Sequence, residues 1–160
     1  MFALTFLSAL GAGLVAGIFF AFSAFIMSAL GRLSPAGGIS AMQSINVVVL
    51  NPLFFAVFFG TAAASLALAI AALIGWSDAS APYLLAGSLL YLVGTILVTM
   101  LFNVPLNNRL ASVTPGSSEG AAVWTRYLSA WTAWNHVRTA ASLAAAASFI
   151  MALKYGISDP

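Results

Sequence analysis

The chain has 160 residues, of which 62% are hydrophobic and only 5% are charged, whereas a soluble domain carries about 25% charged residues. So few charges cannot cover a surface that faces water, and a net charge of +2 scattered along the chain gives no reason to expect a nucleic-acid partner. Because cysteine is absent, disulfides, thiolate metal sites and cysteine nucleophiles are excluded.

Four apolar segments are long enough to cross a bilayer, which takes about 20 residues of α-helix. The first begins without the basic residues of a signal peptide and is too long for one, so we predict a retained helix. Residues 39–50 form either a short interfacial helix or the beginning of the second span. Asn51 followed by Pro52 is typical of a helix N-cap and first helical residue. The four predicted spans cover roughly residues 3–30, 52–75, 83–104 and 127–153.

The spacers between these spans, at residues 31–38, 75–82 and 103–120, are rich in Gly, Pro, Ser and Asn, as turns are. We therefore predict one transmembrane domain over residues 1–160, an all-α integral membrane bundle of four helices in up-down-up-down order. Small residues that recur along the helices indicate where backbones approach closely, namely Ala9, Gly13, Gly17 and Ala21 in the first helix and Gly87 and Gly94 in the third.

Three arginines, Arg32, Arg109 and Arg126, lie on one side of this topology. The positive-inside rule then predicts that residues 31–51 and 105–126 are cytoplasmic and that both termini lie outside. The expected localisation is a bacterial inner (plasma) membrane. The sequence leaves open whether the protein forms a homo-oligomer.

Polar side chains near the ends of three helices fall on this same arginine side. Such groups are costly in lipid unless they are satisfied or functional, so their convergence predicts a shared pocket. In the last helix, a step of about 100° per residue places His136 at or beyond the edge of one wedge, which holds Trp124, Tyr127, Trp131, Trp134, Asn135, Arg138 and Ser142. Pro105, between Asn103 and Asn107, should bend the third helix and free a backbone carbonyl. The candidate site residues are Gln43, Asn46, Asn103, Asn107, Arg109, Trp131, Trp134, Asn135, His136 and Arg138.

Structural alternatives apply to each of these residues. The tryptophans at 124, 131 and 134 suit an interfacial aromatic belt, and Arg109 and Arg126 suit contacts with lipid headgroups. Asn51, Asn103 and Asn107 suit helix ends, and His136 suits either a base or a satisfied structural group.

The predicted spans contain no carboxylate, which excludes a carboxylate pair or proton relay, and the chain has only one histidine, too few for a bis-histidine haem. We therefore predict no metal site and no bound cofactor. What remains is an aromatic pocket lined by amides with one fixed cation. It suits a flat apolar ligand with phenol or ketone oxygens, because rings stack on rings and arginine stabilises an oxyanion.

Three stretches, MQSIN (42–46), NVPLNNRL (103–110) and WTAWNHVRT (131–139), give the whole chain a resemblance to the anthrone oxygenase-like family of small four-helix membrane proteins. The resemblance implies oxidation of the central methylene of an anthrone to a quinone ketone by O₂, without a bound cofactor. The residues that match its motifs are Gln43, Asn46, Asn103, Pro105, Asn107, Arg109, Trp131, Asn135 and Arg138.

A mechanism follows for an anthrone or hydroquinone in this pocket. Arg138 and the amides of Asn103 or Asn135 would stabilise an anion, and His136 or a water held by asparagines would take the proton. The partners expected are therefore an apolar aromatic molecule, O₂ and membrane lipid. The main alternative is a non-catalytic membrane module that binds a quinone, a lipid or a partner subunit. A metal- or haem-containing redox protein and a transporter are weaker alternatives.

Overall fold

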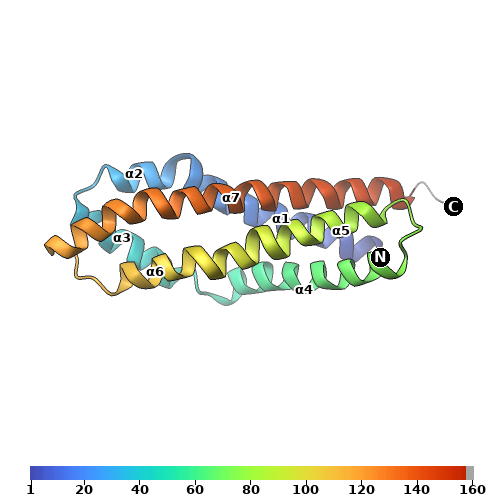
Figure 1. Ribbon diagram of the computed structural model, residues 1–160, viewed down its shortest axis with the longest axis horizontal. Coiled ribbons are helices and arrows are strands. Elements are labelled where there is room, and N and C mark those ends of the chain that lie inside the picture. Colours follow the sequence, from blue (N-terminus) through green and yellow to red (C-terminus); the bar gives the residue numbers. More distant parts are fainter. Residues whose placement is uncertain (158–160) are drawn as a thin grey trace.

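A computed structural model describes residues 1–157, and this part of the chain is helical, with no strand. Four helical runs are long and apolar enough to cross a membrane, at Phe2–Gly31, Pro52–Ile74, Ala81–Ala111 and Ser118–Gly156. They lie alongside one another along the long axis of the molecule (Figure 1). The predicted all-α membrane bundle is confirmed.

Two of the four runs are interrupted by π-helical turns. The first consists of α1 (Phe2–Ala21), η1 (Phe22–Ile26) and α2 (Met27–Gly31). The third consists of α5 (Ala81–Leu89), η2 (Leu90–Leu97), η3 (Thr99–Asn103) and α6 (Val104–Ala111). A π-helical turn changes the direction in which later side chains point, and such turns are frequent at functional sites.

Residues 39–50 belong to a separate helix, α3 (Pro35–Val48), which precedes α4 (Pro52–Ile74). Both helices begin with a capping side chain and a proline in the first turn. The Asn51 Oδ1 accepts a hydrogen bond from the Phe54 N–H at 3.0 Å, which confirms the predicted N-cap. The Ser34 Oγ likewise accepts from the Gly37 N–H at 3.2 Å, so α3 begins inside the predicted 31–38 spacer.

The third and fourth runs are longer than predicted, which corrects the 103–120 spacer. Pro105 lies inside this continuous run, directly after the π-helical η3, and the helix continues past it to Ala111. The last helix, α7 (Ser118–Ile157), has 40 residues and a length of about 60 Å. A bilayer core is about 30 Å thick, so α7 is twice as long as a span requires.

Two apolar cores follow one another along the bundle. The long core joins α1, α4, α5, η2 and the C-terminal half of α7, around residues such as Leu68, Tyr91 and Phe149. The end core joins α2, α3, α6 and the N-terminal half of α7, and it contains Met27, Leu30, Ile39, Met42, Leu110, Val113, Trp124, Tyr127 and Trp131. Helix α4 packs against α1, α5 and η2, whereas α3 packs against α2, α6 and α7. The end core lies toward the α6–α7 turn, and the N-terminus lies at the opposite end (Figure 1).

The expectation about small residues is right for the third helix and wrong for part of the first. A Cβ on Gly87 would lie 2.8 Å from the Phe149 ring, so close packing of α5 on α7 requires glycine there. A Cβ on Gly13 or Gly17 would meet no atom within 4 Å. The buried face of α1 is instead formed by neighbouring positions, such as Gly11, Ala12, Val15 and Ala16. Four-residue spacing alone does not say which face of a helix is buried.

Candidate functional site

Arg138 is buried near the middle of α7, with only 4% of its surface exposed. Its guanidinium carbon lies 4.1 Å from the centroid of the Phe19 ring and 5.1 Å from that of the Trp131 ring, which are cation–π distances. One terminal nitrogen donates to the Asn135 Oδ1 at 2.8 Å and the other to the Thr99 Oγ1 at 3.3 Å. The Nε, although buried, has no hydrogen-bond partner.

No carboxylate neutralises this charge within residues 1–157. The ion pair in that range is Arg109 with Glu119 at 2.8 Å, on the exposed surface, and Asp78 lies in the turn between α4 and α5. Because an arginine carries five N–H donors, two hydrogen bonds leave donors available for an anionic ligand.

Asn135 holds Arg138 by the orientation of its own amide. Its Nδ2 donates to the Phe19 carbonyl and to the Ser23 Oγ, both at 2.7 Å. Both acceptors belong to the first helical run, Phe19 in α1 and Ser23 in η1. With the nitrogen side fixed in this way, the Oδ1 must face the Arg138 guanidinium. Asn135 is fully buried and thus connects α1 and η1 to the cation on α7.

A second amide, Asn107, gathers two aromatic side chains. Its Oδ1 accepts from the Tyr127 hydroxyl and from the Trp131 indole N–H, both at 2.8 Å. These bonds fix the Trp131 ring that lies against Arg138. Asn103, one turn earlier and buried, donates through Nδ2 to the Trp131 carbonyl at 3.2 Å, while its Oδ1 has no partner. Asn103 and Asn107 therefore hold the α7 wall of the site rather than ending the third helix.

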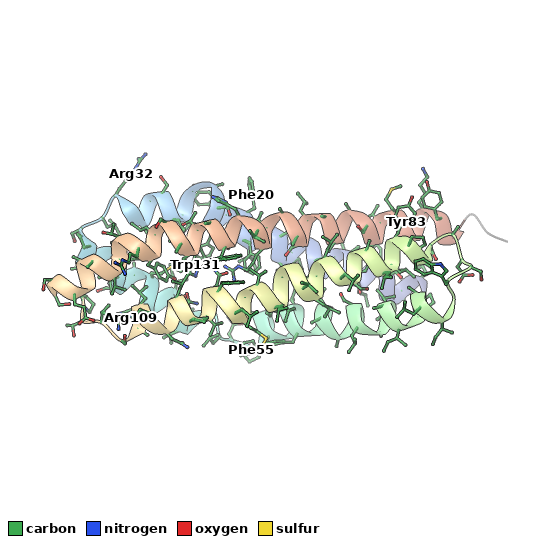
Figure 2. All side chains as sticks on the ribbon, viewed as in Figure 1. Phe20, Arg32, Phe55, Tyr83, Arg109 and Trp131 are labelled. Carbon is green, nitrogen blue, oxygen red and sulfur yellow. The ribbon has the colours of Figure 1, made fainter. Side chains whose placement is uncertain are left out.

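A cavity of about 190 Å³ lies beside these groups, where the long core meets the end core. Its polar lining comes from three separate segments, with Asn46 on α3, Thr99 and Asn107 on η3 and α6, and Arg138 on α7. The rest is apolar and strongly aromatic, with rings from Phe19, Phe22, Phe54, Phe55, Phe58, Phe59 and Trp131. Figure 2 shows Trp131 inside the bundle and Phe55 on its outer edge.

The structure brings Asn46, Asn103, Asn107, Trp131, Asn135 and Arg138 together, as the sequence predicted, and separates four other candidates. His136 is exposed on the outer face of α7 and does not line the cavity. Trp134 also lies outside it, stacked on the Phe102 ring with centroids 3.6 Å apart.

Gln43 and Arg109 have contacts that explain them structurally. The Gln43 Nε2 donates to the carbonyls of Leu110 at 2.9 Å and Val113 at 3.1 Å, so it ties α3 to the C-terminal end of α6. Arg109, in its exposed pair with Glu119, lies in a surface groove between α6 and α7 that does not include Arg138.

Several residues that line the cavity were not predicted from the sequence. Thr99 lies four residues before Asn103, so helical spacing could have placed it on the same face. The pairs Phe54–Phe55 and Phe58–Phe59, one turn apart, form an aromatic wall just after the α4 cap, which that repeat could have suggested. Nothing in the sequence around Phe19 or Ser23 marks them, because their role depends on the approach of α7.

Comparison with known families places most of the chain in one of them. Residues 53–148, more than half of the chain, match the family described as anthrone oxygenase. The chain belongs to the anthrone oxygenase family. The matched range contains the cluster of Asn103, Asn107, Trp131, Asn135 and Arg138 but begins after Gln43 and Asn46. No curated protein and no solved structure matches the chain.

Proposed function

We propose that this family member oxidises an apolar aromatic substrate of the anthrone or hydroquinone type with O₂, holding the substrate as an anion beside Arg138. The observation that carries the proposal is a buried guanidinium with no carboxylate partner in residues 1–157, in the wall of an aromatic cavity. Membership of the anthrone oxygenase family supports the same reaction class.

The cost of placing Arg138 in the bundle favours a role for its charge. Arg138 is 4% exposed, and burying a cation among apolar groups without an opposite charge is costly wherever it lies along the bundle. Its protein partners are an amide oxygen, a hydroxyl and two rings, and all of these are neutral. A bound oxyanion would supply the missing opposite charge and a partner for the Nε.

The chemistry balances with an anthrone as substrate. Loss of a proton from the central methylene gives an enolate, whose oxygen is stabilised by the Arg138 N–H donors. The enolate passes one electron to O₂, the carbon radical and superoxide combine through a new C–O bond, and the resulting peroxide anion takes back the proton to give a hydroperoxide. The remaining proton on that carbon is then removed as the O–O bond breaks and hydroxide leaves; this proton and the hydroxide make one water, and a ketone is left. A hydroquinone would instead pass two electrons and two protons to O₂ and release hydrogen peroxide. Neither route calls for a bound cofactor.

The proton acceptor in this proposal is a water held by amides. Asn46 and Asn107 line the cavity, and because the Asn107 Oδ1 is occupied by Tyr127 and Trp131, its Nδ2 is the group that would hold a water. His136, the other predicted base, is exposed on the far side of α7 from Phe19 and Trp131. Its role as a base stays a prediction, but a water in the cavity is closer to the Arg138 donors.

The test uses Arg138→Lys and Arg138→Leu, compared with the unmodified protein. Lysine keeps the charge but loses the planar fork that contacts Asn135 and Thr99 together. We expect anthrone-dependent O₂ uptake to fall about 10-fold or more in Arg138→Lys, as on loss of a preorganised donor. Arg138→Leu should be inactive and should melt in detergent at or above the temperature of the unmodified protein.

Full turnover in Arg138→Lys would contradict the oxyanion role. Unfolding of Arg138→Leu would show that the residue is a structural tie. Binding of a quinone without any O₂ uptake by the unmodified protein would favour the second candidate function, a non-catalytic module for a quinone, a lipid or a partner subunit, which the same cavity accommodates.

A further inference from the structure

Part of the cavity wall is also outer surface of the protein. Among its lining residues, Leu50 is 62% exposed and Met100 is 59% exposed. All of the exposed lining residues are apolar, and they are Ile18, Leu50, Phe55, Phe59, Met100 and Val104. The cavity is thus continuous with the surface through an apolar rim.

The rim exists because the end core and the long core use different helices on this side. Helix α4 packs against α1, α5 and η2, while its predecessor α3 packs against α6 and α7. The chain passes from one to the other at the α3–α4 turn, near Leu50. The exposed lining residues here are Phe55 of α4, Met100 of η3 and Val104 of α6. Phe55 is on the outer edge of the bundle in Figure 2.

The polarity of the outer surface changes near the cavity opening. Around the long core it is apolar, with exposed residues such as Leu10, Leu14, Leu66, Ile70, Val93 and Leu97. Around the end core it is mixed, with exposed polar residues such as Ser28, Ser44, Asn108, Ser112, Thr125 and Ser129 beside the exposed apolar Phe25, Leu33, Val47 and Val48. The long core therefore has the surface of a part in lipid, whereas the polar groups around the end core suit headgroups and water.

Helix lengths place this change of surface polarity at the level of Arg138 and the cavity opening. At the far end of the bundle, Tyr83 and Tyr155 stack with centroids 5.0 Å apart, near Trp76, as in an interfacial aromatic belt. A bilayer core of about 30 Å corresponds to about 20 helical residues. Counted along α7 from Tyr155, that length ends near Asn135. Arg138 and the cavity opening then lie just inside the opposite boundary of the hydrocarbon.

We propose that the substrate enters this cavity sideways from the bilayer, through the opening framed by Leu50, Phe55, Met100 and Val104. The identity of the substrate rests on the proposed function, while the route rests on the rim and on the change of surface. Such an opening admits a ring system that dissolves in the membrane with its oxygens near the headgroups, and it excludes polar phenols from water. The oxygens then meet Arg138, Asn46 and Asn107, and the hydrocarbon part meets the phenylalanines of α4.

The absence of cysteine makes a clean blocking experiment available. Met100→Cys places a thiol on the rim, and Leu101→Cys is the matched control, because Leu101 is 57% exposed in the same segment but does not line the cavity. Each variant is put into phosphatidylcholine vesicles and reacted with a bulky aromatic maleimide. Association of anthraquinone is followed by quenching of tryptophan fluorescence, and O₂ uptake is measured with an anthrone.

We expect the modified Met100→Cys protein to bind anthraquinone about 10-fold more slowly, as for an obstructed approach, and the modified Leu101→Cys protein to be unaffected. Unchanged association in the modified Met100→Cys protein, or an equal loss in both, would overturn the proposal. If modified Met100→Cys unfolds, Val104→Cys on the same rim takes its place. Slower binding in the rim variant together with no O₂ uptake by the unmodified protein would support the route and contradict the proposed oxidation.

A second measurement separates entry from lipid and entry from water. A fluorophore on Met100→Cys should be quenched by phosphatidylcholine brominated high on the acyl chain and spared by iodide in the buffer. Quenching by iodide but not by the brominated lipid would mean that the opening faces water, and it would overturn the proposal.

Discussion

At the scale of single residues, the site depends on the direction in which each amide points. Asn135 donates to α1 and η1 and therefore offers its oxygen to Arg138. Asn107 offers one oxygen to two donors and fixes the Trp131 ring. The Arg138 guanidinium is positioned by neutral groups that can form few further hydrogen bonds. Truncating any one of these groups should therefore disturb its position.

Asn135→Ala and His136→Ala are adjacent changes with opposite expected results. Asn135→Ala removes a side-chain donor to the Phe19 carbonyl and leaves one buried Arg138 nitrogen without its acceptor, at a cost of about 1–3 kcal/mol in stability. It should also reduce anthrone-dependent O₂ uptake strongly, because the guanidinium loses its orientation. His136→Ala changes an exposed residue, so its effect on stability should stay within about 0.5 kcal/mol and its activity should remain.

Detergent melting curves and O₂ uptake on the same preparations measure both effects. A larger loss of activity in a well-folded His136→Ala protein would identify the histidine as the base and would reverse this ranking.

At the scale of helices, side chains tie the third run to its neighbours along its whole length. The Tyr91 hydroxyl donates to the Phe58 carbonyl of α4 at 3.0 Å, and Thr95 and Ser142 share a hydrogen bond of 2.7 Å between η2 and α7. Thr99 and Asn103, in the π-helical η3, then reach the Arg138 site. Because η3 is π-helical, the third run can keep these hydrogen bonds and still direct the Thr99 and Asn103 side chains toward α7.

Two glycine substitutions test the packing of these helices. In Gly87→Ala, the new methyl group would lie 2.8 Å from the Phe149 ring and 3.2 Å from the Ala145 carbonyl oxygen. Overpacking of this kind costs about 1–3 kcal/mol, so the melting temperature should fall. Gly13→Ala is the control, because its methyl group meets nothing within 4 Å, and it should be neutral or stabilising by up to about 1 kcal/mol. A loss of stability in Gly13→Ala would mean that this face of α1 is covered by a second chain.

The cap of α4 gives a smaller effect at the same scale. Asn51→Ala removes the acceptor for the Phe54 N–H and should cost about 1 kcal/mol. Asn108→Ala, an exposed asparagine in α6, should leave the melting temperature unchanged. Equal melting of the two variants would show that Asn51 does not stabilise α4.

At the scale of the whole molecule, the two cores divide the bundle into a part with an apolar outer surface and a part whose outer surface is mixed polar and apolar. The cavity lies where they meet, because there the chain passes from α3, which packs on α7, to α4, which packs on α1 and α5. A substrate held at this junction has its rings at the depth of the α4 phenylalanines and its oxygens near the polar end. Such a position suits a molecule that is poorly soluble in water.

Single cysteines report the orientation proposed from the arginines. Ser44→Cys lies on α3 and Ser77→Cys in the turn between α4 and α5, and both positions are exposed. A maleimide that cannot cross membranes should label Ser77→Cys in intact cells and Ser44→Cys only after permeabilisation, if the arginine side is cytoplasmic. Leu66→Cys, on the apolar face of α4, should resist labelling in both conditions. The reverse pattern for Ser44→Cys and Ser77→Cys would invert the topology.

The sequence by itself determined the membrane bundle, the four apolar runs, the α4 cap and the convergence of amides and Arg138 at one end. Each follows from local physics: helix-length apolar stretches have one stable solution in lipid, and polar groups at matching helix ends must meet in an up-down bundle. The wedge predicted on α7 is buried at Trp124, Tyr127, Trp131, Asn135, Arg138 and Ser142, but its seventh member, Trp134, lies against Phe102 outside the cavity.

Only the tertiary structure decided which of the remaining residues reach the cavity. His136 and Trp134 belong to the same nine-residue motif as Arg138, yet the packing of α1 and η3 on α7 leaves both outside. Phe19, Ser23 and Thr99 enter the site because separate helical runs with π-helical turns bring them to α7. The cavity itself exists because α3 is a separate helix and α4 begins only after it, at Pro52. These features depend on helix rotation and on contacts between distant segments, which helical periodicity along one segment does not specify.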